Sequence, residues 1–95
     1  MLTAGQDAVE LALARSGLSA DDVACFEFAE AFAALCLRFE RDLTIDAEHG
    51  DDRMNPNGGT LAMGHAFGAT GTIMIGGCVE ELERRQGRWG VAAVS

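Results

Sequence analysis

The segment of residues 55–71 constrains the fold most, because glycine recurs through it at positions 58, 59, 64, 68 and 71. Glycine has no Cβ atom, so the backbone can turn sharply there or approach a ligand closely, while helices and strands are weakened. We therefore expect a glycine-rich turn. His65 stands in this segment just ahead of a predicted helix, where an imidazole can face a cleft.

Two roles are open to His65 from its own position. Its imidazole can donate a hydrogen bond to an oxyanion or take a proton near neutral pH. It can equally be a loop histidine whose hydrogen bonds are satisfied by the backbone, which is the commoner role for an isolated histidine. No lysine follows the glycines, which excludes a Walker-type phosphate loop.

Before this segment the sequence shows helical and strand patterns in turn. Residues 7–16 are good helix formers and end at Gly17, a common stop signal. Residues 23–28 alternate β-branched or aromatic side chains with small or acidic ones, which predicts a strand. A second helix then runs to residue 42, with Glu30 at the junction of strand and helix. The apolar stripe of this helix consists of Phe32, Leu35, Cys36 and Phe39.

After residue 42 a loop, a helix and a strand are predicted. Residues 43–59 contain the only proline together with many acidic and asparagine residues, which indicates a loop. A helix from residue 72 ends in Arg84 and Arg85, whose charges complement the helix dipole, and residues 89–94 read as a short buried strand. The order α-β-α-loop-α-β predicts one incomplete α/β layered domain over residues 1–95. The stripe of the last helix consists of Ile75, Cys78, Val79 and Leu82.

Charge and hydrophobicity restrict the partners of the chain. Its 95 residues are 48% hydrophobic and 23% charged, which suits one small globular domain. The net charge of −8, from 15 acidic and 7 basic residues, makes nucleic acid and anionic membranes poor partners. No apolar run reaches the ~18 residues of a membrane span, and the N-terminus lacks a signal-peptide pattern. We expect a cytoplasmic protein.

The cysteines and histidines do not predict a metal centre. The chain has three cysteines, an odd number, at Cys25, Cys36 and Cys78. They are widely spaced and set among apolar neighbours, which favours reduced, buried thiols with structural roles. His49 and His65 lie far apart in the sequence, and no cysteine pair has the spacing of zinc ligands. We therefore expect no bound metal.

The neighbours of His65 resemble one family. Asn57-Gly58-Gly59, then Gly64-His65, then Gly68-Ala69-Thr70-Gly71 look like the thiolase pattern Asn-Gly-Gly, Gly-His-Pro and Gly-Ala-Ser/Thr-Gly. Upstream, residues 26–33 resemble the thiolase segment that ends in Asn-Glu-Ala-Phe-Ala, and residues 11–22 resemble the helix and turn before it. The resemblance covers essentially the whole chain. It implies the C-terminal domain of a thiolase, either an acetyl-CoA acetyltransferase or a 3-ketoacyl-CoA thiolase.

The resemblance implies acyltransferase chemistry on coenzyme A thioesters, with no permanently bound cofactor. In thiolases a cysteine of the N-terminal half is acylated by an acyl-CoA, and the histidine of the Gly-His pair activates that thiol and helps to bind the thioester oxygen. By position that histidine is His65, and we expect it to face a cleft within hydrogen-bonding reach of the segment around Ala29 and Glu30. The loop that would bind the substrate comprises Asn57, Gly58, Gly59, Gly64 and Gly68.

Three positions depart from the thiolase pattern. Ala29 replaces the asparagine that holds an oxyanion-hole water, and a methyl group has no donor. Ala66 replaces the proline after the histidine. Ser95 aligns with the second cysteine, which removes the α-proton, and a hydroxyl is a far weaker base than a thiolate. Glu30 is retained, and orienting its neighbours is its expected role.

The missing nucleophile implies a partner. The chain is expected to be a fragment, or a small subunit, that an N-terminal thiolase half completes; alone it should be inactive, and the full-length protein should be a homo-oligomer. A noncatalytic acyl-CoA-binding or partner subunit and a retro-aldol lyase of the thiolase superfamily are the alternatives. Certain apolar side chains should contact the missing half as well as one another. They are Phe32, Leu35, Phe39, Ile75 and Val79.

Overall fold

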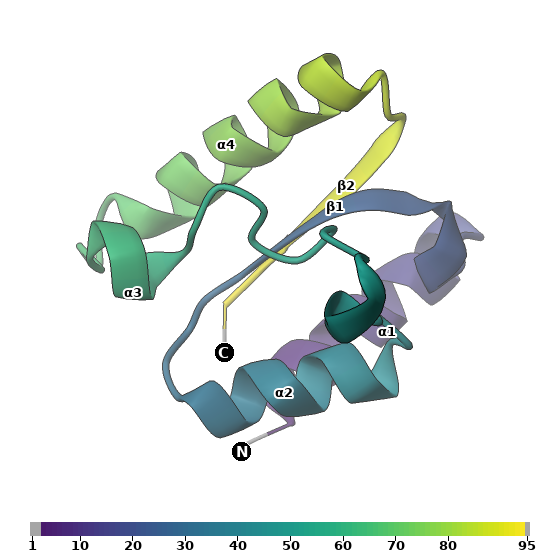
Figure 1. Cartoon of the computed structure of the whole chain (residues 1–95), viewed down its shortest axis with the longest axis horizontal. Helices are drawn as coiled ribbons and strands as arrows, with labels where there is room; N and C mark the ends of the chain where they lie inside the picture. Colours follow the sequence, from purple (N-terminus) through teal and green to yellow (C-terminus); the bar gives the residue numbers. More distant parts are fainter. Residues whose placement is uncertain (1–2, 95) are drawn as a thin grey trace.

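A pair of parallel strands runs through the middle of the molecule, which a computed structural model describes over residues 3–94. Strand β1 (Val23–Phe28) pairs with β2 (Trp89–Ala93), and an irregularity between Val23 and Cys25 shifts the register. Helix α4 (Thr70–Arg85) lies on one side of the strands, and α1 (Ala4–Ser16) and α2 (Ala33–Asp42) lie on the other (Figure 1). The predicted α/β layered class and the order of its main elements are confirmed.

The turn from α1 into β1 follows its sequence signals closely. Gly17 adopts the left-handed conformation with φ of 69°, and the Leu18 N–H donates to the Leu13 carbonyl at 2.9 Å, which ends α1. Ser19 and Asp22 then form a reciprocal capping box around a short 3-10 turn, Ala20–Asp22. This turn delivers the chain directly into β1, whose predicted bounds are those observed.

The hydrophobic core lies between the strands and the pair α1 and α2. Phe39 of α2 is 1% exposed, stacks on Phe28 with ring centroids 4.4 Å apart, and meets Phe26 edge-on at 5.7 Å. Leu35 is buried beside it, so these two stripe residues of α2 pack inside the chain itself. Phe32, at the helix N-cap, is 65% exposed instead.

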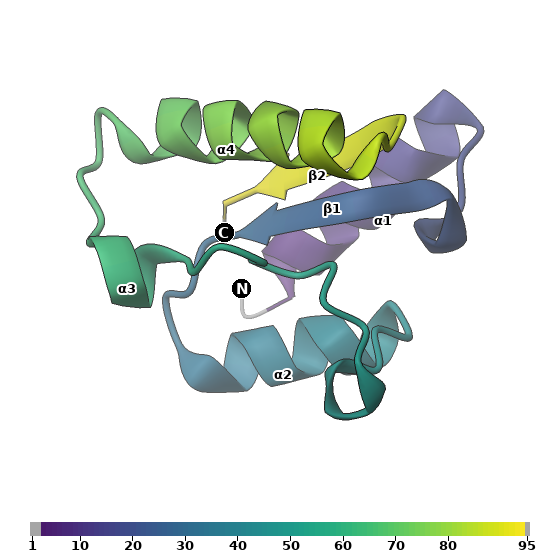
Figure 2. The same cartoon turned by 45° about the horizontal axis from the view of Figure 1, so that its top comes forward.

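The predicted loop of residues 43–59 is tied to the free edge of β1. The Phe26 N–H donates to the Arg53 carbonyl at 2.7 Å, and the Asn55 N–H donates to the Phe26 carbonyl at 2.8 Å. The Asn55 side chain extends this ladder, because its Oδ1 accepts from the Phe28 N–H at 2.9 Å and its Nδ2 donates to the Phe28 carbonyl at 3.0 Å. The segment then passes into the short helix α3 (Thr60–Met63), which a loop connects to the start of α4 (Figure 2).

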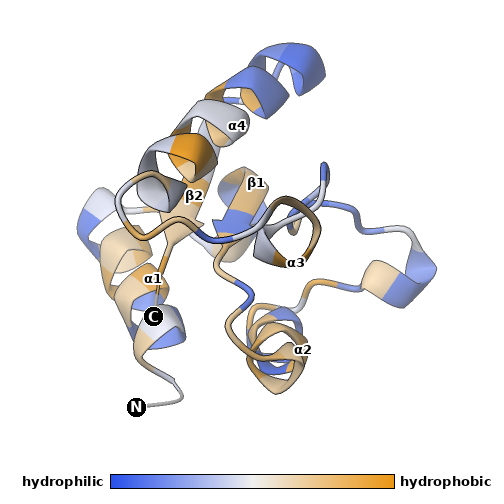
Figure 3. Ribbon diagram, turned by 90° about the vertical axis from the view of Figure 1, so that its left-hand side faces the viewer, coloured by the Kyte–Doolittle hydropathy of each residue, from blue (hydrophilic) through white to orange (hydrophobic). Residues whose placement is uncertain are grey.

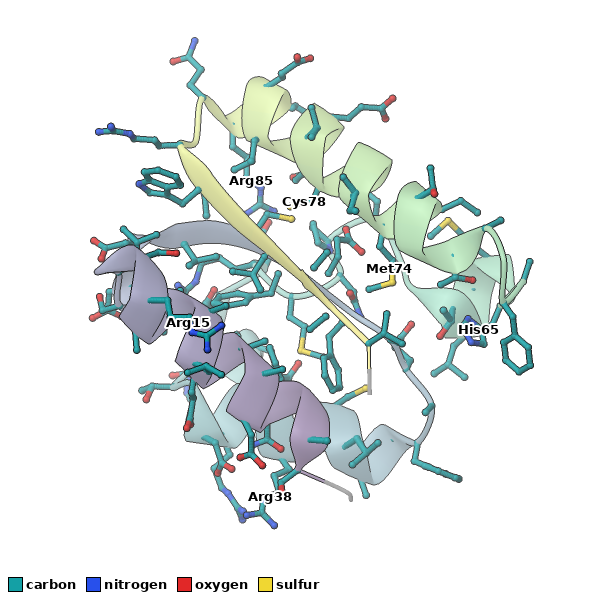
Figure 4. The ribbon with its side chains drawn as sticks, turned by 180° about the vertical axis from the view of Figure 1, so that it is seen from behind. Arg15, Arg38, His65, Met74, Cys78 and Arg85 are labelled. Atoms are coloured by element: carbon teal, nitrogen blue, oxygen red, sulfur yellow. The ribbon has the colours of Figure 1, made fainter. Side chains whose placement is uncertain are left out.

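The expected burial of β2 is wrong, and the buried face of α4 differs in part from its apolar stripe. Helix α4 buries Met74, Cys78 and Glu81, whereas Ile75 and Val79, which are expected to contact a missing half, are 60% and 50% exposed. Met74 and Cys78 point from α4 toward the strands in Figure 4. The apolar stripe does not predict the buried face of α4 because one of the buried residues, Glu81, is charged. Strand β2 is also more open than predicted, since most of its residues are exposed, whereas residues 53–55 cover the other edge of β1.

The last turns of α4 are hydrophilic, and its hydrophobic residues lie before them along the ribbon (Figure 3). Ile73, Ile75 and Val79 of this helix are each at least half exposed. Leu61, Met63 and Phe67 of the neighbouring α3 segment are exposed as well. Across residues 3–94, none of the helices combines the length and the apolarity needed to cross a membrane.

Replacing Phe39 by alanine should lower the free energy of unfolding by about 3 kcal/mol or more, because it opens a cavity beneath two other phenylalanines. Phe32→Ala is the matched control, and this exposed residue should change the same quantity by no more than about 0.5 kcal/mol. Urea unfolding followed by circular dichroism measures both. Similar losses in the two variants would show that the core does not lie where α2 meets β1.

Candidate active site

His65 lies on the loop between α3 and α4 and lines a hollow of about 260 Å³. Ala29 and Glu30, just beyond the end of β1, line the same hollow, and so does Val94 just beyond β2. The hollow thus sits at the carboxyl ends of two parallel strands, the edge at which open α/β sheets place their ligands. The predicted meeting of His65 with the segment at Ala29 and Glu30 is found.

The imidazole of His65 makes its hydrogen bond within its own loop. Its Nδ1 lies 2.9 Å from Oγ1 of Thr70, the first residue of α4. Thr70 Oγ1 in turn donates to the Ala66 carbonyl at 2.9 Å, and the ring packs edge-on against Phe67 at 5.1 Å. Hydrogen-bonding reach from His65 was expected toward Ala29 and Glu30, whereas the bond formed goes to Thr70.

Glu30 holds the start of α3 in place. Its backbone N–H donates to Thr60 Oγ1 at 3.1 Å, and its Oε1 accepts from the Leu61 N–H at 3.3 Å. Gly59 passes so close that a Cβ atom there would lie 1.9 Å from Glu30 Oε1. The glycine at position 59 therefore permits a close approach between a backbone and a carboxylate. The residues at the strand-to-helix junction orient one another, with Glu30 at their centre.

A buried carboxylate anchors the Asn57 loop to α4. Glu81 is 2% exposed, and its Oε2 accepts from Asn57 Nδ2 at 2.8 Å. The guanidinium groups of Arg84 and Arg85 also donate to it, the latter at 2.5 Å. These bonds, from Arg84 first and then Arg85 and Asn57, lower the pKa of Glu81 to about 2. Arg85 reaches on to the Ala24 carbonyl of β1 at 3.4 Å.

The remaining predicted site residues have simpler surroundings. Ala29 is buried, and its backbone N–H donates to the Ala93 carbonyl at 3.0 Å. Its side chain is a methyl group, which cannot donate a hydrogen bond. Gly58 and Gly64 have φ of 85°, a conformation that favours glycine, whereas Gly68 has open space around it. Ser95 lies outside the described residues. Among residues 3–94, no three His, Cys, Asp or Glu side chains gather in a way that could hold a metal ion.

A larger hollow, of about 400 Å³, lies next to the first between α3, α4 and β1. Thr60 borders both hollows, while Gly64 and Thr70 border the larger one. Glu27 of β1 lines it and is 5% exposed. Burial first, and then the charges of Glu81 and Glu30, raises the pKa of the Glu27 carboxyl.

The cysteines are poor candidates for a nucleophile. Cys25 and Cys78 are buried free thiols, and Cys36 is partly buried. Burial, followed by the neighbouring Cys78, raises the pKa of Cys25 to about 12. Burial also raises the pKa of Cys36 and of Cys78. Since the thiolate is the reactive species, these raised pKa values disfavour a nucleophilic role for all three groups.

Sequence reasoning passed over three residues that shape this site: Thr70, Asn55 and Glu81. Thr70 belonged to a recognised motif, but a threonine at a helix start is also an ordinary capping residue. Asn55 sat in a predicted loop with no sign that its side chain would pair with a strand. Glu81 carried the clearest signal, because Arg84 and Arg85 follow it at helical i+3 and i+4 spacing.

Gly59→Ala should displace the Glu30 carboxylate and break its bond to the Leu61 N–H. We expect a loss of about 1 kcal/mol in the free energy of unfolding, together with faster hydrogen exchange at the amides of α3. Gly68→Ala is the control, because a Cβ there meets open space. Unchanged exchange in Gly59→Ala would contradict the close approach.

The Glu81 carboxylate should make stability depend on pH at low values. Its folded pKa of about 2 lies below the ordinary 4.5, so its contribution is present above about pH 4.5 and is lost as the pH falls through about 2. The difference in unfolding free energy between the native chain and Glu81→Gln should therefore be largest at neutral pH and shrink on acidification. Chemical unfolding at a series of pH values measures it; a difference that does not vary with pH would refute the ion-paired state of Glu81.

Comparisons with known proteins show which family this chain resembles. Residues 1–95 match the family described as Thiolase, C-terminal domain. The chain is 38% identical over 88 residues to a 3-ketoacyl-CoA thiolase of Bacillus subtilis, covering 93% of this chain and 22% of that protein. It is 38% identical over 91 residues to the steroid 3-ketoacyl-CoA thiolase FadA6 of Mycobacterium tuberculosis, covering 96% and 21%.

A solved structure agrees with the sequence matches. The crystal structure of human mitochondrial 3-ketoacyl-CoA thiolase in complex with CoA superimposes with a TM-score of 0.81 and 37% identity, covering 90% of this chain and 21% of that chain. The chain therefore spans about a fifth of the length of the relatives it matches. With its whole length matched by the family and its fold shared with a solved member, this chain belongs to the thiolase family as a C-terminal domain segment.

Proposed function

We propose that this chain supplies the histidine side of a thiolase active site that acts on 3-ketoacyl-CoA thioesters. The relatives named above are 3-ketoacyl-CoA thiolases, and the human structure contains CoA. Since the chain spans about a fifth of their length, the rest of the site comes from an N-terminal thiolase half, on the same polypeptide or on a partner. The full-length assembly is a homo-oligomer in this proposal.

The observation that carries the proposal is the shared hollow of His65 and the segment at Ala29 and Glu30. These groups are more than thirty positions apart in the sequence, yet the fold brings them together at the carboxyl ends of the strands. An imidazole at the mouth of such a hollow can take the proton of an incoming cysteine thiol. It can then donate a hydrogen bond to the thioester oxygen as negative charge develops there.

The nucleophile comes from outside this chain. Cys25, Cys36 and Cys78 have raised pKa values, and none of them lines the hollow of His65. In thiolysis the cysteine sulfur bonds to the 3-keto carbon, the carbon–carbon bond to the acetyl-CoA unit breaks, and the departing carbanion takes up a proton. A CoA thiol then accepts the acyl group from sulfur. The chain alone is accordingly inactive.

Two substitutions make this thiolysis slow in the parent protein. Ala29 offers a methyl where an asparagine would hold an oxyanion-hole water, and one lost donor costs about 3 kcal/mol of transition-state stabilisation. Ser95 offers a hydroxyl where a cysteine would exchange the α-proton. The two changes act on different steps, so Ala29→Asn and Ser95→Cys raise activity together while either alone does little.

A noncatalytic acyl-CoA-binding subunit is the second candidate. It is favoured by Ala29, because the fold is intact around this residue while the donor of the oxyanion hole is gone. Such a protein would bind an acyl-CoA in the completed site without acylating a cysteine. A turnover measurement separates the two candidates.

The test is His65→Asn in the full-length parent, with His49→Asn as the matched control. His49 is an exposed histidine paired with Asp46 at 2.7 Å in a surface turn, so its loss should leave turnover unchanged within about twofold. His65→Asn should lower the thiolysis of a 3-ketoacyl-CoA by about a hundredfold or more. Equal turnover in the two variants would eliminate the catalytic role, and binding of acyl-CoA without turnover in the native parent would support the second candidate.

A further inference from the structure

Thr70 stands between the His65 ring and a backbone carbonyl. Its Oγ1 is 2.9 Å from His65 Nδ1 and 2.9 Å from the Ala66 carbonyl oxygen, and the residue is 3% exposed. The Thr70 N–H also donates to this carbonyl, at 2.8 Å. The hydroxyl is therefore enclosed between two groups at hydrogen-bonding distance.

The chemistry of the three groups fixes the direction of each hydrogen bond. A threonine hydroxyl has one proton to donate, and a carbonyl oxygen can only accept. The Thr70 proton therefore goes to the Ala66 carbonyl, which leaves Oγ1 to accept from the ring. Nδ1 must then carry a hydrogen. The reverse assignment would aim the Thr70 proton at Nδ1 and set two oxygen lone pairs against each other across 2.9 Å.

We propose that Thr70 is a positioning residue that holds neutral His65 as the Nδ1–H tautomer. This inference deepens the proposed function and rests on it for the catalytic consequence. With its hydrogen on Nδ1, the ring presents the lone pair of Nε2, which has no hydrogen-bond partner within residues 3–94. Nε2 is then the atom that takes the thiol proton.

The arrangement also serves the protonated ring. When Nε2 takes a proton, the imidazolium keeps its Nδ1–H donated to Thr70, so no hydrogen bond inside the loop has to change. Thr70 is rigidly held, because it begins the 16-residue helix α4 and its side chain is buried. The ring is thereby kept in one orientation through both states, as an orienting partner does for a catalytic histidine.

The first test reads the tautomer directly. We expect nitrogen-15 spectra of the 95-residue chain, with labelled histidine, to show His65 protonated on Nδ1 at a pH where the ring is neutral. Thr70→Val removes the hydroxyl at nearly constant shape and should shift the ring toward the Nε2–H form, while Thr70→Ser should keep the Nδ1–H form. Predominant Nε2–H in the native chain would overturn the inference, even if Thr70→Val failed to fold.

The second test uses turnover in the full-length parent and separates this inference from the proposed function. Thr70→Val should lower kcat by about tenfold or more with little change in KM, and Thr70→Ser should stay within about twofold of the native protein. An Nδ1–H ring with no loss in His65→Asn would overturn the proposed function alone. An Nε2–H ring with a large loss in His65→Asn would overturn the role of Thr70 alone.

Discussion

The buried carboxylate of Glu81 is the interaction on which the site depends. It joins helix α4 to the Asn57 loop, while Arg85, one of its partners, reaches the Ala24 carbonyl of β1. A carboxylate with so little exposure needs hydrogen-bond donors, and Glu81 has two guanidinium groups and one amide around it. Together these bonds hold α4, β1 and the Asn-Gly-Gly loop as one unit.

The site is then assembled by close approach around Glu30. The Asn57 loop leads directly to Gly59, where the missing Cβ lets the backbone pass against the Glu30 carboxylate. Glu30 in turn accepts from the Leu61 N–H, which fixes the start of α3 and thereby the loop that carries His65. Position 59 therefore matters to His65 through packing, although it touches neither the ring nor Thr70.

Local signals in the sequence predicted the elements well. The strand of residues 23–28 was predicted at its observed bounds, because alternation and the Ser19 to Asp22 capping box agree with each other. The inward face of α4 was misplaced because hydrophobic periodicity assigns charged residues to solvent, whereas Glu81 is buried and paired with Arg84, Arg85 and Asn57. The role of Asn55 was not predicted for a different reason, since its pairing with β1 is a long-range contact.

The candidate site was predictable as a set of residues, but its hydrogen bonds were not. The motifs named His65, Glu30 and the glycines, and the fold brings His65 and Glu30 to one hollow. The partner of the ring is decided by the turn between α3 and α4, which places Thr70 and the Ala66 carbonyl on the same side of the imidazole. The spacing of motifs gives only the separation of residues along the chain. The tautomer of His65 depends on the direction in which the Thr70 hydroxyl donates its proton. That choice is a property of the folded loop, and it leaves Nε2 of His65, a residue that lines the hollow, as the nitrogen that can accept a proton.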